Sequence, residues 1–166
     1  MLSMVNAITM KNDNQVLITE LEKLLRGGTA HIGFEDAIAE LPEALLGQTP
    51  ENLPYSIWQL VEHIRIAQAD MLDFCRNPDY KALNWPEDYW PKEAAPKDKA
   101  AFERSVRSIL EDQEAFIQLL HQGDLYTPFP HGEGQTLLRE ALQIADHTAY
   151  HVAEIVVIRR LLDVWK

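Results

Sequence analysis

A long segment near the C-terminus places apolar residues at the spacing of an α-helix. Between Thr136 and Leu162 an apolar side chain recurs every three or four residues, as on one face of a helix. These apolar positions are Leu137, Ala141, Ile144, Val152, Ile155, Ile158 and Leu162. Thr136 is a residue type that caps helix N-termini. A helix over residues 136–162 would cross a whole domain, so the rest of the chain is expected to pack around it.

The same spacing predicts three other long helices and one short helix. They cover approximately residues 12–26, 34–41, 56–77 and 97–122. Glycine or proline follows the end of each long helix, and no segment alternates apolar and polar residues as a strand does. The predicted fold class is therefore all-α. We expect a four-helix bundle with a short extra helix after the first helix and a long crossover loop between the second and third.

Length and apolar content predict one domain. The chain has 166 residues, 46% of them apolar, which is enough for one hydrophobic core over residues 1–166. Residues 1–11 precede the first periodic segment and are expected to form a flexible N-terminus. The loop over residues 77–96 holds four prolines and four aromatic residues. A loop of this length and composition is expected to pack on the bundle.

Charge and composition exclude several classes of partner. Lys and Arg total 15 against 26 Asp and Glu, which gives a net charge of −11, and no basic cluster offsets it. We therefore expect no nucleic-acid partner. No stretch reaches the ~18 apolar residues of a membrane span and no secretory signal is visible, so we expect no membrane partner and a cytoplasmic location. The single cysteine, Cys75, excludes an internal disulfide.

Three histidines lie on the predicted inward faces of two helices. His147 and His151 are one turn apart and share a helix face. If Ile144 marks the centre of the buried face, His151 lies about 20° and His147 about 60° from it. His63 lies on the apolar stripe of the 56–77 helix. A lone inward histidine is usually a hydrogen-bonded core residue, whereas a shared divalent cation would hold all three imidazoles neutral. Spacing alone leaves both interpretations open.

Two known metal patterns do not fit these histidines. A zincin requires Glu directly after the first His, where Thr148 stands, and a di-iron bundle requires Glu three residues before each His. A mononuclear site with His63, His147 and His151 as its metal ligands remains. Three neutral nitrogen ligands suit Zn²⁺, Ni²⁺ or Fe²⁺ and leave a position open for substrate.

The other candidate ligands are weaker. His31 follows a glycine break, His121 falls at a helix end and His131 lies in a Pro/Gly loop, so a surface or supporting role is expected for each. Glu154 is three residues after His151 and could be a fourth ligand, a proton acceptor or a solvated carboxylate. The sequence assigns no role to any of these four residues.

The assembled pattern resembles the DinB/YfiT-like superfamily of metal-dependent bundles. The resemblance is carried by the segment Leu53 to Ile64, by Tyr89-Trp90-Pro91, and by Gly134-Gln135-Thr136 leading to His147-Thr148-Ala149-Tyr150-His151. It implies a four-helix bundle in up-down-down-up order and a divalent metal held by His63, His147 and His151. It also implies a homodimer.

The resemblance further implies a class of chemistry without naming a substrate. Members of this family with known chemistry look like thiol-dependent transferases or isomerases that use bacillithiol, mycothiol or glutathione. We therefore expect a small-molecule substrate and a low-molecular-weight thiol as cosubstrate. Two alternatives stay open, namely a metal-dependent hydrolase that uses water and a non-catalytic bundle that binds metal or a small ligand. No catalytic residue is assigned.

Overall fold

The chain is helical throughout its described length. The computed structural model describes the backbone of residues 2–28 and 30–165 and the side chains of residues 14–28 and 30–165. Its elements are α1 (Leu2–Leu25), α2 (Phe34–Ile38), a short 3₁₀ helix (Glu43–Leu45), α3 (Ile57–Arg76), α4 (Lys99–Gln122) and α5 (Leu137–Leu161). Within these residues there is no strand, which confirms the all-α prediction. No described helix is long and apolar enough to span a membrane.

The helix boundaries differ from the predicted ones at the N-terminal end. The first helix begins at Leu2, well before residue 12, and flexibility of residues 1–11 stays a prediction. The second helix stops at Ile38, because the backbone is already extended at Ala39 (ψ 141°) and turns to a positive φ of 55° at Glu40. The 3₁₀ helix was not predicted. Pro42 lies just before it with φ −64°, a value compatible with a helix start.

Side-chain caps define where the long helices begin. The Ser56 hydroxyl accepts from the Gln59 backbone N–H, and the Gln59 side chain accepts from the Ser56 N–H, which completes a capping box. Thr136 caps α5 by accepting from the Arg139 N–H, as predicted. Asp98 caps α4 in the same way. The start of each of these three helices is thus encoded locally, and α3 and α5 carry the histidines.

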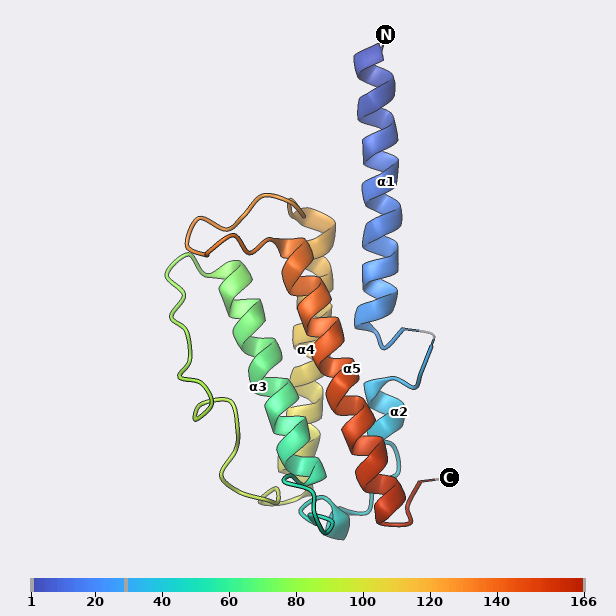
Figure 1. Ribbon diagram of the computed structural model, residues 1–166, viewed down its shortest axis with the longest axis vertical. Helices are drawn as coiled ribbons and strands as arrows, with labels where there is room; N and C mark the ends of the chain where they lie inside the picture. The colour runs from blue at the N-terminus through green and yellow to red at the C-terminus, as the bar shows by residue number, and fades with distance from the viewer. Residues whose placement is uncertain (1, 29, 166) are drawn as a thin grey trace.

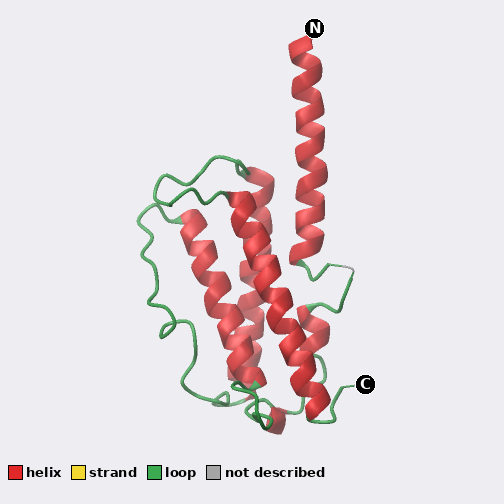
Figure 2. Cartoon of the chain, viewed as in Figure 1, coloured by secondary structure: helices red, strands yellow, loops and turns green. Residues whose placement is uncertain are grey.

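The helix directions explain the long loop. Figure 1 shows α3 and α4 running the same way, with α1 and α5 running the opposite way. A connection between parallel neighbours must return along the whole length of the bundle, and residues 77–98 do so as an irregular segment beside α3 (Figure 2). The N-terminal half of α1 extends past the ends of the other helices (Figure 1).

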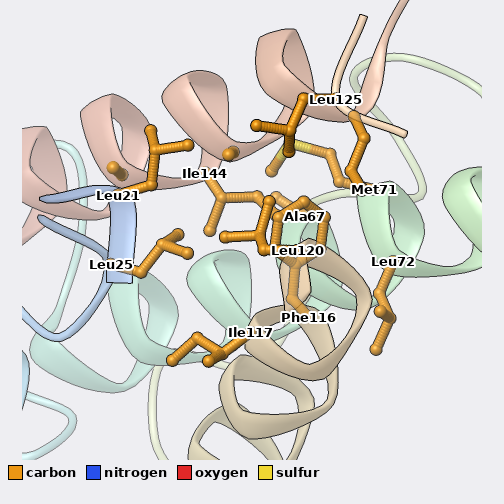
Figure 3. Packing of buried hydrophobic residues seen from close by; sticks show 13 residues of the cluster. Leu21, Leu25, Ala67, Met71, Leu72, Phe116, Ile117, Leu120, Leu125 and Ile144 are labelled. Atoms are coloured by element: carbon orange, nitrogen blue, oxygen red, sulfur yellow. The ribbon is translucent and has the colours of Figure 1, made fainter. Parts of the chain in front are cut away.

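The core consists of two apolar clusters. The first gathers thirteen buried residues, among them Leu21, Ala67, Phe116 and Ile144, as Figure 3 shows. The second gathers twelve buried residues, among them Ile64 and Val152. On α3 the boundary between the clusters falls between Ile64 and Ala67, and on α5 between Ala145 and Val152. All three predicted ligands therefore lie at or near the junction of the two clusters.

A close backbone approach fixes the end of α1 against the start of α2. Gly27 has φ +105°, and a Cβ added there would lie 2.7 Å from the Cα of Gly33, the residue that precedes α2. Gly134 has a similar φ of +100°, but a Cβ there would meet open space. A side chain at either glycine would therefore strain the backbone, but only a side chain at Gly27 would also clash with a neighbouring residue.

We predict that Gly27→Ala destabilises the protein more than Gly134→Ala. The Gly134 variant is expected to lose about 1 kcal/mol of unfolding free energy through backbone strain. The Gly27 variant should lose that amount and the energy of the clash with Gly33. Urea denaturation of both variants measures the difference, and equal losses would show that the α1–α2 approach is not a tight contact.

Candidate metal centre

The three predicted ligands converge on one point. His63 from α3 and His147 from α5 place their Nε2 atoms 3.0 Å apart, and the Nε2 atoms of His147 and His151 lie 3.2 Å apart. All three candidate ligand atoms lie within 4.8 Å of one another. Two nitrogens bound at zinc distances in a tetrahedron lie about 3.3 Å apart. The spacing of the imidazoles thus fits a shared metal ion.

Hydrogen bonds at the Nδ1 atoms of His63 and His151 determine that their Nε2 atoms, which point toward the other histidines, are unprotonated acceptors. The Nδ1–H of His63 donates to the Tyr89 backbone carbonyl at 2.9 Å, and the Nδ1–H of His151 donates to the Glu154 carboxylate at 2.6 Å. A neutral imidazole with its proton on Nδ1 has only a lone pair on Nε2. His63 and His151 therefore both present acceptors to the centre of the group.

This arrangement lacks hydrogen-bond donors. The Nε2 of His147 lies between the acceptor nitrogens of His63 and His151, and one N–H can satisfy only one of them. His63 and His151 are only 2% and 5% exposed, so water does not readily supply the missing donor. A cation at the centre would be bound by all three lone pairs. The donor set therefore fits a divalent transition metal better than a hydrogen-bonded core cluster.

Burial keeps the imidazoles neutral. Burial lowers the pKa of His147 from 6.5 to about 4, and electrostatic repulsion from His151 and His63 makes a smaller contribution in the same direction. Burial, with a smaller contribution from electrostatic repulsion by His63, lowers the pKa of His151 to about 4 as well. The pKa of His63 is also lowered by burial, although its hydrogen bond to Tyr89 opposes the shift. At neutral pH the three rings are in the form that binds metal, without competition from protons.

The long loop holds His63 in place. Trp90 stacks on the His63 ring with centroids 3.8 Å apart and an interplanar angle of 5°, and Tyr55 stacks on the other face of Trp90 at 4.0 Å. The same loop supplies the Tyr89 carbonyl that accepts from His63. The prediction that this aromatic loop packs on the bundle is confirmed. Tyr89 was not predicted as a site residue, because its contribution is a backbone carbonyl that leaves no sequence signal.

A carboxylate on α3 anchors the loop further along. Asp70 accepts from the Tyr80 hydroxyl at 2.8 Å and from the Tyr89 hydroxyl at 2.6 Å, one on each oxygen. Burial and then the contact with Asp70 raise the pKa of both phenols, so both remain hydrogen-bond donors. Tyr89 is thus held at its hydroxyl by Asp70 while its carbonyl orients His63.

Glu154 supports the group rather than joining it. Among the described residues, the group able to hold a metal contains the three histidines and no carboxylate. Glu154 accepts from the Nδ1–H of His151, and burial raises its pKa. Of the three alternatives predicted for Glu154, the geometry favours the acceptor, because Glu154 accepts the Nδ1 proton of His151 in a hydrogen bond.

The remaining histidines and the cysteine lie outside the group. His121 pairs with Glu22 at 3.2 Å, the ring of His131 contacts the Phe74 carbonyl at 2.9 Å, and His31 is exposed. Burial raises the pKa of Cys75 to about 12, which makes it a packed thiol and not a nucleophile.

Comparison with known proteins yields one family match. A family model described as the DinB superfamily matches residues 33–155, which is more than half of the chain and includes all three histidines of the group. Searches of curated proteins and of solved structures found no match.

We predict that metal-free protein loses stability as the pH falls from about 6.5 to about 4. The unfolded chain binds protons at histidines with ordinary pKa values near 6.5, whereas folded His147 and His151 resist protonation down to about 4. Acid therefore favours the unfolded state across this interval. Thermal unfolding followed by circular dichroism with a chelator present measures the effect. The double variant His147→Gln, His151→Gln should show a shallower dependence on pH, and an unchanged slope would contradict the assignment.

Proposed function

Because the chain belongs to the DinB superfamily, we propose that it is a metal-dependent enzyme that carries out thiol-dependent transferase or isomerase chemistry on a small molecule. The ligands proposed are His63, His147 and His151, and the metal is a divalent transition ion, Zn²⁺ or Ni²⁺ before Fe²⁺. The observation that supports the site most directly is the lack of donors among three converging Nε2 atoms, which belong to buried His63 and His151 and to half-buried His147. A bundle core without a metal has no need of that arrangement.

Three neutral imidazole ligands leave the full charge of a bound cation uncompensated. When bound, such a metal would supply a double positive charge that favours the thiolate form of a thiol placed beside it. The Tyr89 carbonyl and Glu154 hold two of the rings in the required tautomer. Since no carboxylate of the described residues joins the group, a coordination position would remain open for the thiol.

An apolar cavity beside the histidines offers space for a substrate. It measures about 230 Å³ and is lined mainly by apolar side chains, among them Tyr55, Leu60, Tyr150 and Val157, with Glu154 at its polar end. Tyr55 also stacks on Trp90, and Tyr150 packs edge-on against His151 with ring centroids 5.0 Å apart. The cavity walls therefore continue directly into the residues that support the site. An apolar portion of a small substrate would pack against these side chains.

The family resemblance also leads us to propose a homodimer of four-helix bundles, and the lack of a visible secretory signal in the sequence leads us to propose a cytoplasmic location. Support for the dimer comes from apolar side chains that α1 and α5 leave in solvent. These exposed residues are Val16, Leu24, Leu142, Tyr150, Val157 and Leu161. Apolar residues repeated along neighbouring helix surfaces are typical of subunit contacts. In this proposal α1 and α5 would pack against the same helices of a second copy.

We predict that His151→Ala abolishes metal binding in protein purified without a histidine tag. The variant removes one of three ligands and leaves two imidazoles on a site with no protein carboxylate to replace it. Elemental analysis by mass spectrometry measures bound metal per chain. His121→Ala serves as the control, because His121 lies outside the group and contacts Glu22. Equal metal content in wild type and His151→Ala would refute the site. Turnover with low-molecular-weight thiols, lost in the same variant, would then test the chemistry.

A further inference from the structure

A second chamber lies between α3 and α5, about two helical turns from the histidines. Moving from His63 to Asp70 along α3, and from His147 back to Glu140 along the antiparallel α5, covers the same number of residues. Asp70 and Glu140 therefore face each other across the groove much as His63 and His147 do. They line a cavity of about 270 Å³, which we call the acidic chamber. Its main walls are Asp70, Phe74, Tyr80, Arg139, Glu140 and Gln143.

Glu140 is buried in this chamber without a partner. The residue is 5% exposed, no described residue is hydrogen-bonded or ion-paired to its carboxylate, and the carboxylate oxygens keep a contact with solvent in the chamber. Burial raises its pKa, the charge of Arg139 opposes this shift, and the neighbouring charge of Asp70 adds to it. Arg139 lies at the exposed rim and forms no ion pair with it. The Glu140 carboxylate lies in a narrow space without a protein donor, so a cation bound there would take the place of solvent as its partner.

Asp70 and two aromatic rings add to the preference for a cation. Each Asp70 oxygen accepts one phenol hydroxyl and keeps a lone pair for another donor. Phe74 and Tyr80 pack edge to face at 5.2 Å and both line the chamber. Carboxylates combined with aromatic faces suit an organic ammonium group, which donates hydrogen bonds and is attracted to π-systems.

The chamber is better suited to an organic ammonium than to a metal ion. Within the described part of the chain, three or more metal-binding side chains gather only at the histidines. Asp70 and Glu140 alone provide too few ligands for a divalent metal. The volume of the chamber also exceeds what a single ion fills and suits a group of several heavy atoms.

We propose that the acidic chamber binds the ammonium group of a small amine ligand that extends along α5 toward His147. Arg139 and Gln143 line both the chamber and a surface depression that His147 also lines, so the two spaces are neighbours. Binding of the amine depends on Glu140 and Asp70 and not on a metal. The amine could in turn be part of the substrate or of the thiol cosubstrate, and this part of the proposal alone rests on the proposed function.

Calorimetric titration of chelator-treated full-length protein with n-butylammonium chloride tests the proposal. Saturable binding is expected for n-butylammonium and none for butan-1-ol, which has the same chain without the charge. Glu140→Gln should weaken the binding at least about tenfold, because a charge-assisted hydrogen bond is lost. Glu133→Gln is the matched control, since it removes the same charge from an exposed position near the same helix and should leave the affinity unchanged.

Two results would overturn the proposal. One is the absence of saturable binding by n-butylammonium, and the other is equal affinity in wild type and Glu140→Gln. Circular dichroism establishes that the Glu140 variant is folded. Should it not fold, Asp70→Asn takes its place and is expected to weaken binding as well, with unchanged affinity counting against the chamber. Because the protein is metal-free in this titration, a failure of the histidine site cannot produce a negative result.

Discussion

The hydrogen bond from His63 to the Tyr89 carbonyl connects the long loop to the helix that carries the site. It fixes the proton of His63 on Nδ1 and turns the Nε2 lone pair toward His147 and His151. It also brings Trp90 onto the His63 ring and Tyr55 onto Trp90. The loop exists because α3 and α4 run parallel and require a long connection (Figures 1 and 2). Helix order and ligand orientation are therefore consequences of the same segment.

Helical periodicity was sufficient to predict most of the helices and the inward direction of the three histidines. The angular position of His147 and His151 relative to Ile144 predicted their inward direction, and Ser56 and Thr136 marked the starts of the two helices involved. These features are local, and a helix converts sequence spacing directly into direction in space. The start of α1 was predicted less well, because apolar spacing in its first half is weak and a helix boundary there has no capping signal.

The supporting contacts could not be predicted because they depend on tertiary packing. Tyr89 acts through its backbone, which is chemically the same in every residue, and Asp70 reaches it from another segment. Glu140 is similar in sequence context to any solvated helix carboxylate, and only the tertiary structure shows that it is buried. The candidate ligands are thus visible in the sequence, whereas the groups that orient them are brought together only when the loop packs on the helices.

The matched spacing of the two pairs across α3 and α5 has a consequence for how the molecule responds to ligands. His63 faces His147, and Asp70 faces Glu140, in a single alignment of two antiparallel helices. Sliding one helix along the other by a turn would break both pairs together. If both proposed sites bind their ligands, occupancy of either pair would favour the alignment of the helices that the other pair needs, and thermodynamic linkage would make the benefit equal in both directions. The two proposed sites thus depend on one structural quantity, the register of α5 on α3.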